Sequence, residues 1–188
     1  MDQPHTIATA RLILRPMRRE DGAALFALLN NWNVARWLTR LPWPYHPEDM
    51  TEFIETIALP RSAGPKPTFV ILLDGRPIGA VECTGQATIE QSQSDDSDLG
   101  YWIGQPYWGC GYATEVVAAL IDHAFAAPSA VVIRSAFVQG NAQSWRVQRK
   151  LGFEIVNQVM AFCRPHGREL PLICTRLARA TYEARRRS

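Results

Sequence analysis

The residues most able to bind a ligand lie in the stretch 99–114, LGYWIGQPYWGCGYAT. Here a predicted strand, 99–103, runs into a loop that contains Gly109 and Gly111, and the loop opens the helix predicted for 112–125. Glycine lets a backbone approach a ligand closely. The start of a helix presents unpaired N–H groups and the positive end of the helix dipole. This order of elements predicts a cradle for a pyrophosphate group.

The cradle does not match two better-known phosphate motifs. Its loop has no Lys followed by Ser or Thr, as a P-loop requires, and it lacks the full GxGxxG spacing of dinucleotide sites. Two glycines before a helix are also compatible with a tight turn that binds nothing. The residues of the loop alone leave both interpretations open.

The four cysteines indicate neither a metal site nor a thiol nucleophile. They are Cys83, Cys110, Cys163 and Cys174, without CxxC spacing and without a histidine in ligand spacing. Scattered cysteines suit a reducing cytosol. Cys110 lies inside the cradle loop, but no His or other base is near in sequence to activate it.

The composition is typical of one compact domain. The chain has 188 residues, of which 47% are hydrophobic and 20% are charged. We expect one domain over 1–188, with a core at 9–178 and a basic tail at 179–188. The net charge of +2 gives no argument for nucleic-acid binding. We find no signal peptide in 1–11 and no run able to span a bilayer, so we expect a cytoplasmic protein without a membrane partner.

Strands and helices alternate along the chain. Asp21 is expected to cap a first helix, and Asp74-Gly75 is a strong signal for a hairpin turn. Strands are predicted at 11–16, 68–73, 77–84, 99–103, 130–138, 154–163 and 170–177. Further helices are predicted at 47–57, 112–125 and 141–151, and a polar loop at 86–98. This interleaving with hairpins predicts an α/β (α+β) domain of three layers rather than a purely parallel sheet.

Residues 99–114 resemble motif A of the GNAT superfamily of N-acetyltransferases, Gln/Arg-x-x-Gly-x-Gly/Ala. Trp108, Gly111 and Ala113 take its three defined places, and Trp108 departs from the usual Gln or Arg. Through Glu115 the text is similar to that of the Rim-type subgroup, the ribosomal-protein N-terminal acetyltransferases.

Three further segments resemble the same subgroup, in the same order. They are TARLILRPMRRED at 9–21, DGRPIGAVE at 74–82, and the NxxSxxVxxKLGF helix at 141–153. The resemblance therefore covers 9–153 and is weakest at 32–67, where members differ by substrate. It implies a mixed, mostly antiparallel sheet, flanked by helices and splayed at an acetyl-CoA site.

The resemblance also implies roles for individual residues. Acetyl-CoA would be the cosubstrate, with no metal, and backbone N–H groups of the cradle would hold its pyrophosphate. The edge of strand 99–103 would pair with the pantetheine arm, Asn141 would bond the pantetheine amide, and Ser144 would help to protonate the leaving thiolate. The implied contacts are Tyr101, Trp102, Ile103, Trp108, Gly109, Cys110, Gly111, Tyr112, Ala113, Thr114, Asn141 and Ser144.

Asn141 and Ser144 also have structural interpretations. Asn141 is a good helix N-cap, and Ser144 could be an ordinary solvated helix residue. Many superfamily members have a proton-donating Tyr at the position of Gln148, which cannot donate a proton usefully. Ser144 is therefore the better candidate here, with a water as the alternative.

The reaction needs a neutral amine, so a base or a water path must remove a proton. Glu82 is the first candidate, because a carboxylate in the strand text AVEC is costly if it is buried. Strand alternation could instead point Glu82 at solvent. Asp98 and His46 are lesser candidates.

The aromatic segment before the second helix is the expected acceptor pocket. Trp32, Trp37 and Tyr45, with His46 beside them, could wall this pocket, or the aromatic rings could pack helices onto the sheet. The acceptor is either a protein or peptide N-terminus or a small amine. The alternative function is an acyl-CoA-binding sensor or interaction module without turnover. The oligomeric state is open, with a homodimer as one alternative.

Overall fold

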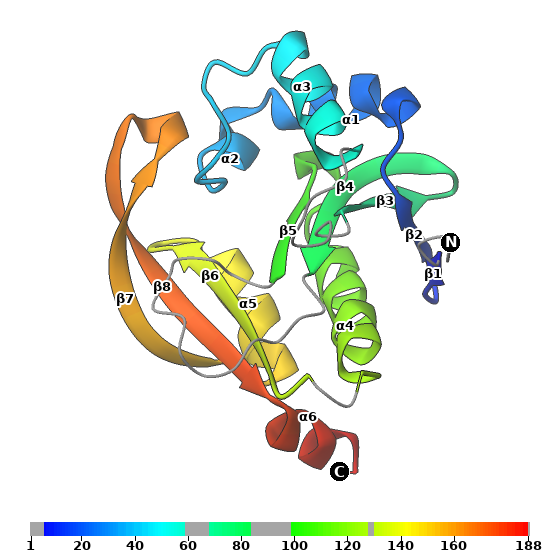
Figure 1. Ribbon diagram of the computed structural model, residues 1–188, viewed down its shortest axis with the longest axis vertical. Helices are drawn as coiled ribbons and strands as arrows, with labels where there is room; N and C mark the ends of the chain where they lie inside the picture. Colours follow the sequence, from blue (N-terminus) through cyan, green and yellow to red (C-terminus); the bar gives the residue numbers. More distant parts are fainter. Residues whose placement is uncertain (1–5, 59–67, 84–98, 128–129, 188) are drawn as a thin grey trace.

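The computed structural model describes residues 6–58, 68–83, 99–127 and 130–187. Its strands form one sheet in the order β1-β2-β3-β4-β5-β6-β8-β7 (Figure 1). The strands are β1 Ile7–Ala8, β2 Leu12–Pro16, β3 Thr68–Leu73, β4 Arg76–Cys83, β5 Leu99–Ile103, β6 Val132–Val138, β7 Glu154–Cys163 and β8 Arg168–Ala178. The helices are α1 Gly22–Leu29, α2 Trp32–Ala35, α3 Pro47–Ala58, α4 Tyr112–Phe125, α5 Ala142–Leu151 and α6 Arg179–Arg186.

The sheet divides in the middle. Among the described residues, β5 and β6 are the one parallel pair, and they share a single register position, Leu99 opposite Ser135. Beyond that point the two strands part, as Figure 1 shows between the β1–β5 half and the β6–β8–β7 half. The prediction of a mixed, mostly antiparallel sheet that splays is confirmed.

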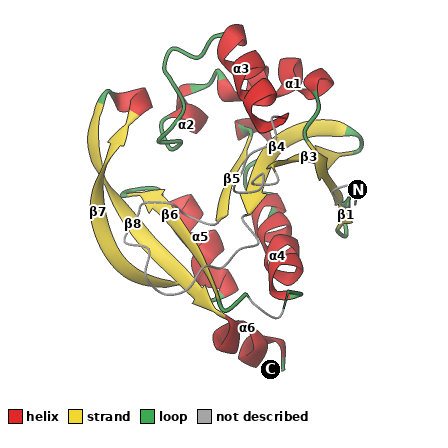
Figure 2. Cartoon of the chain, viewed as in Figure 1, coloured by secondary structure: helices red, strands yellow, loops and turns green. Residues whose placement is uncertain are grey.

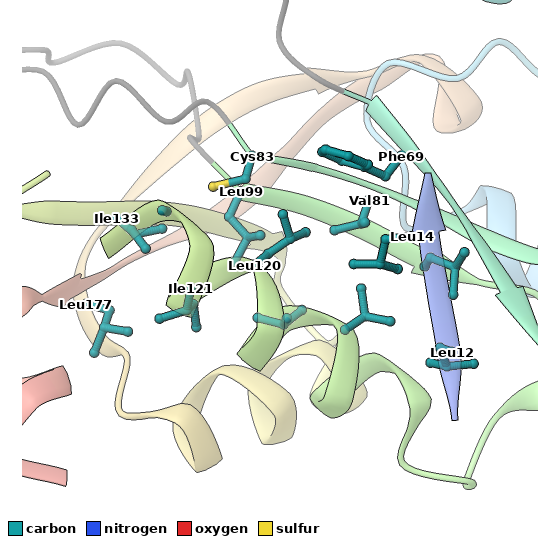
Figure 3. Close-up of a cluster of buried hydrophobic side chains, with 14 of the residues drawn as sticks. Leu12, Leu14, Phe69, Val81, Cys83, Leu99, Leu120, Ile121, Ile133 and Leu177 are labelled. Carbon is teal, nitrogen blue, oxygen red and sulfur yellow. The ribbon is translucent and has the colours of Figure 1, made fainter. Parts of the chain in front are cut away.

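The three layers follow from the alternation of side chains along β3. Phe69 and Ile71 belong to the hydrophobic cluster that contains α4, and Val70 and Leu72 belong to the cluster that contains α1 and α3. Successive strand residues point to opposite faces of a sheet. Helix α4 therefore covers one face, and α1 with α3 covers the other (Figure 2). Figure 3 shows the α4-side cluster, with Leu12, Leu14 and Leu120 among its labelled side chains.

Most predicted elements are present, with shifted ends. The turn at Asp74-Gly75 has φ of 49° and 76°, as the hairpin prediction requires.

The prediction that the Asp21 side chain caps the first helix is wrong. Its carboxylate accepts from the Arg15 guanidinium at 2.6 and 2.7 Å and from the Arg18 backbone N–H at 2.8 Å. Asp21 therefore closes the 3-10 turn η1 (Arg19–Asp21) and anchors β2, because a buried carboxylate requires a partner. The loop predicted at 86–98, with Asp98, lies outside the described residues.

The C-terminal segment is helical and attached to the domain. Residues 179–188 were expected as a basic tail, and α6 occupies most of them. The guanidinium of Arg179 donates to the carbonyls of Phe125, Ala127 and Ala130 at 2.9, 2.6 and 2.7 Å. It also lies 5.0 Å from the centre of the Phe125 ring. Arg179 thus satisfies carbonyls at and beyond the end of α4 that have no helical partner.

We expect Arg179→Ala to lower the free energy of unfolding by about 2 kcal/mol, because it removes three charge-assisted hydrogen bonds to carbonyls. Urea unfolding followed by circular dichroism measures this change. Arg186→Ala is the matched control, since Arg186 pairs with Asp122 on the exposed surface. Equal midpoints for Arg179→Ala and the unmutated protein would contradict the anchoring role.

Candidate functional site

The cradle forms where β5 leads into α4. Gly111 is the N-cap of α4 with φ of 81°, and Gly109 has φ of 78°, a left-handed conformation that L side chains rarely adopt. The first helical bond runs from the Glu115 N–H to the Gly111 carbonyl. The N–H groups of Tyr112, Ala113 and Thr114 therefore have no partner within the helix. All three residues line the same cavity, so the helix start can bind an anion.

Trp108 holds the cradle loop against the sheet. Its indole Nε1 donates to the carbonyl of Ile103 at 2.6 Å, and the ring packs against both hydrophobic clusters. The departure from the usual motif residue thus has a structural use, because the indole ties the loop to the end of β5. The bond also occupies one carbonyl of the strand that is predicted to pair with pantetheine.

A clamp formed by Thr9, Arg11 and Glu115 supports the cradle loop, and the sequence did not suggest it. The Glu115 carboxylate accepts from the Thr9 hydroxyl at 2.6 Å and from the backbone N–H and Nε of Arg11, both at 2.8 Å. Arg11 also donates to the Cys110 carbonyl at 3.0 Å. Burial acts to raise the pKa of Glu115, but the hydrogen bonds from Thr9 and Arg11 outweigh it and leave that pKa lowered. The clamp thus fixes the loop and neutralises a carboxylate close to the anion site.

One cavity of about 980 Å³ joins the cradle to the aromatic segment. It runs between the two halves of the sheet, where β5 and β6 have parted. The predicted site residues that line it are Glu82, Tyr101, Trp102, Ile103, Trp108, Gly109, Gly111, Tyr112, Ala113, Thr114, Asn141, Ser144, Trp37 and Tyr45.

Three predicted site residues are not among the described residues that line this cavity: Trp32, His46 and Cys110. Cys110 is exposed, and its thiol lies 3.6 Å from the Trp108 carbonyl. His46 is exposed just before α3, where its backbone N–H donates to the Asp49 carboxylate at 2.7 Å. The Trp32 ring packs against Trp43 at 5.3 Å and against His166 at 5.0 Å. The aromatic segment thus serves partly as a wall and partly as packing.

The tip of the β7–β8 hairpin, η3 (Arg164–His166), closes one side of the cavity. The backbone N–H of Arg164 donates to the Thr39 carbonyl at 2.8 Å, and the His166 ring lies 3.0 Å from the Arg36 carbonyl. Both Thr39 and Arg164 line the cavity. This contact joins the β7–β8 hairpin to the segment that follows α2, and no local pattern in the sequence indicated it.

A buried polar network lies where β5 and β6 part. Asn141 caps α5, because its Oδ1 accepts from the Ser144 N–H at 3.1 Å. Gln148 is fully buried, with Nε2 donating to the Ser144 hydroxyl at 3.3 Å and to the Ser135 hydroxyl at 3.1 Å. Its Oε1 accepts from the Thr175 hydroxyl at 2.6 Å. Ser144 is therefore held by its neighbours and is not an ordinary solvated helix residue.

Glu82 and Tyr45 both line the cavity. Glu82 is half-buried on β4, and its carboxylate lies over Gly100, where an added Cβ would come within 3.1 Å of Oε1. It therefore lines the cavity instead of projecting freely into solvent. Tyr45 is buried, and burial, with a smaller effect of the nearby Asp49 charge, raises the pKa of Tyr45 to about 12. The Tyr45 phenol is thus neutral near pH 7.

The described part of the chain holds no candidate metal cluster and no candidate membrane span. No group of three or more His, Cys, Asp or Glu side chains there could hold a metal ion. None of its helices is both long enough and apolar enough to cross a membrane.

Diverging strands beside a glycine loop and a helix N-terminus define a class of α/β proteins that hold an extended, phosphorylated cosubstrate between the halves of a sheet. The comparisons with known proteins agree with this class. Residues 11–154 match the family model of the acetyltransferase (GNAT) domain. The chain belongs to this family and is an acetyltransferase that uses acetyl-CoA.

The similar proteins span nearly the whole chain. The uncharacterized N-acetyltransferase p20 of Bacillus licheniformis is 25% identical over 94% of this chain and 98% of its own length. Mycobacterium smegmatis RimJ, in complex with a CoA disulfide, is 21% identical with a TM-score of 0.77, covering 94% and 88% of the two chains. RimL, a ribosomal L7/L12 α-N-protein acetyltransferase in complex with coenzyme A, is 16% identical with a TM-score of 0.74, covering 93% and 98%. The two solved structures are similar to this chain in fold.

Proposed function

We propose that the protein transfers the acetyl group of acetyl-CoA to a primary amine by direct attack of the amine on the thioester. One observation carries the proposal: the cradle, Ser144 and the aromatic wall with Glu82 all line the same cavity. The acceptor is a protein or peptide N-terminus or a small amine. The similarity in fold to RimL, named as an α-N-protein acetyltransferase, supports testing N-terminal peptides first.

The cosubstrate would lie along the parted strands. The free N–H groups at the start of α4 would hold its pyrophosphate, and the edge of β5 would pair with the pantetheine arm. The Oδ1 of Asn141 is used in the helix cap, so its amide Nδ2 is the group that would donate to the ligand. Because the cradle is assembled from backbone groups, it is preorganised for an anion.

Glu82 and Ser144 would each serve one of the proton transfers of the reaction, and the nitrogen would lose its second proton to solvent after it bonds to the acetyl carbon. Glu82, on the acceptor side, would take the proton that the amine must lose before it attacks. Ser144, held at the start of α5 by Gln148 and by its own backbone bond to Asn141, would deliver a proton to the departing thiolate.

The deciding experiment titrates acetyl-CoA by calorimetry and then measures thiol release in the same sample over a panel of small amines and N-terminal peptides. Binding followed by release on one acceptor class supports the proposal and identifies the acceptor. Binding without release on any acceptor favours the sensor, and no binding contradicts the cradle assignment. The cytoplasmic location and a homodimer also stay predictions, which fractionation and light scattering would test.

The Arg11–Glu115 clamp leads to a binding prediction. We expect Arg11→Ala to weaken acetyl-CoA binding about tenfold, because the loop loses its support and Glu115 is left uncompensated near the pyrophosphate site. Calorimetry measures the dissociation constant. Arg76→Ala, which removes an exposed charge at the hairpin turn on β4, is the control and should bind normally. Unchanged affinity in Arg11→Ala would show that the clamp does not support the cradle.

The same variant has an expected effect on stability against pH. The pKa of Glu115 is lowered in the folded state. The stabilisation that Glu115 contributes is therefore present above its unfolded-state pKa and is lost as the pH falls through its folded-state pKa. Removing Arg11 raises the folded pKa toward the unfolded value. Arg11→Ala should therefore be less stable than the unmutated protein at neutral pH, and this difference should shrink in acid.

A further inference from the structure

We propose that Tyr101 supplies the proton that Ser144 passes to the departing thiolate, so that the Tyr101 phenol and the Ser144 hydroxyl act as one relay oriented by Gln148. This inference rests on the proposed function and adds to it a residue on a different element. Tyr101 was expected to contribute only the backbone edge of β5. Its side chain instead reaches across the splayed region to α5.

The contact between the two hydroxyl groups is direct. The Tyr101 hydroxyl lies 3.0 Å from the Ser144 Oγ and 3.2 Å from the Ser144 carbonyl. Both residues line the cavity, whereas Gln148 behind them is fully buried. Tyr101 therefore lies beside the serine at the point where β5 has separated from β6.

The surrounding bonds fix the donors at Ser135 and Gln148, whereas in the Tyr101–Ser144 contact either hydroxyl can be the donor. The Ser135 hydroxyl donates to the Leu99 carbonyl at 3.0 Å, so it must accept from Gln148, and the Gln148 Nε2 faces Ser135 and Ser144. The Ser144 Oγ therefore accepts from Gln148. When Tyr101 also donates to that oxygen, the proton of Ser144 is left to point into the cavity.

The phenol is the stronger acid of the pair. An ordinary tyrosine has a pKa of about 10. This value is far closer to the pKa of a thiol than the pKa of an aliphatic hydroxyl is. Burial raises the pKa of Tyr101, and hydrogen bonds with Ser144 and Gln148 oppose this only in part. Tyr101 is therefore neutral at pH 7 and holds the proton that the relay needs.

The protons balance over one turnover. The amine nitrogen bonds to the acetyl carbon, the carbon–sulfur bond breaks, and its electron pair stays on sulfur. The sulfur takes the Ser144 proton while the Ser144 oxygen takes the proton of Tyr101. The acceptor nitrogen loses two protons in all, one to its base before the attack and one to solvent once it is bonded to the acetyl carbon. Solvent returns one of these to the phenolate, and the other is the one proton released per turnover.

Tyr101→Phe tests the relay in the full-length protein. We expect kcat to fall about tenfold, since water must now resupply Ser144, while the dissociation constant of acetyl-CoA stays within about twofold. Tyr182→Phe is the matched control, because it removes an exposed phenol hydroxyl on α6 that is bonded to Asp122 and lies outside the cavity lining. A fluorinated tyrosine at position 101 should restore most of kcat and move the alkaline limb of its pH profile to lower pH, since that phenol is more acidic.

A second readout does not depend on turnover. Tyrosinate absorbance is titrated against pH in the unmutated protein and in Tyr101→Phe. The difference between the two titrations should show one phenol with a pKa above that of an ordinary tyrosine. A phenol already ionised at neutral pH would overturn the relay, as would a Tyr101→Phe protein with unchanged kcat and an unmoved pH profile. If the unmutated protein turns over no acceptor, the proposed function fails together with the relay. Normal turnover by Tyr101→Phe overturns the relay alone.

Discussion

Ser144→Ala should lower kcat about a hundredfold and leave the affinity for acetyl-CoA almost unchanged, because it removes the group that faces the leaving thiolate but no part of the cradle. Its main-chain bond to the Asn141 cap stays in place, so α5 should keep its start. Initial rates of thiol release, with calorimetry on the same preparation, separate the two quantities.

Arg149→Ala is the control for this variant. Arg149 lies on α5, as Ser144 does, but it is exposed and is not among the residues that line the cavity. A loss of acetyl-CoA affinity that matches the loss of kcat in Ser144→Ala would instead assign the serine to binding. Full activity would mean that a water protonates the thiolate.

Glu82→Gln should lower kcat/KM at neutral pH by about a hundredfold, because the protonated amine then loses the carboxylate on β4 that is proposed to take its proton. The change is nearly isosteric, so the packing of the carboxylate over Gly100 should survive. The deficit should shrink as pH rises toward the range in which the amine loses its proton to solvent. A rate profile against pH measures this recovery.

Glu52→Gln provides the comparison, since Glu52 places another carboxylate on the same cavity from α3. If both variants behave alike, the cavity supplies only a general negative potential for a cationic acceptor. If neither variant changes kcat/KM, the proton leaves through water, and Glu82 is a structural residue of β4.

The sequence by itself determined the features that depend on near neighbours. The apolar period of 112–125 predicted α4, and the glycine loop before it predicted an anion site at the helix start. Asp74-Gly75 predicted the hairpin, and Gly152 ends α5 with φ of 97° as expected. The resemblance to GNAT acetyltransferases added the splayed sheet. These features were accessible because capping, turn chemistry and helix periodicity act over a few residues.

The tertiary structure decided which distant side chains meet. Tyr101 and Ser144 are 43 positions apart, and the backbone N–H of Arg11 meets Glu115 over 104 positions. Trp32 and Trp37, close in sequence, take different places, since only Trp37 of the two lines the cavity. Such pairings depend on the order of strands in the sheet and on how far β5 and β6 diverge. Neither leaves a local pattern in the chain, because long-range packing is set by the sum of many contacts between elements.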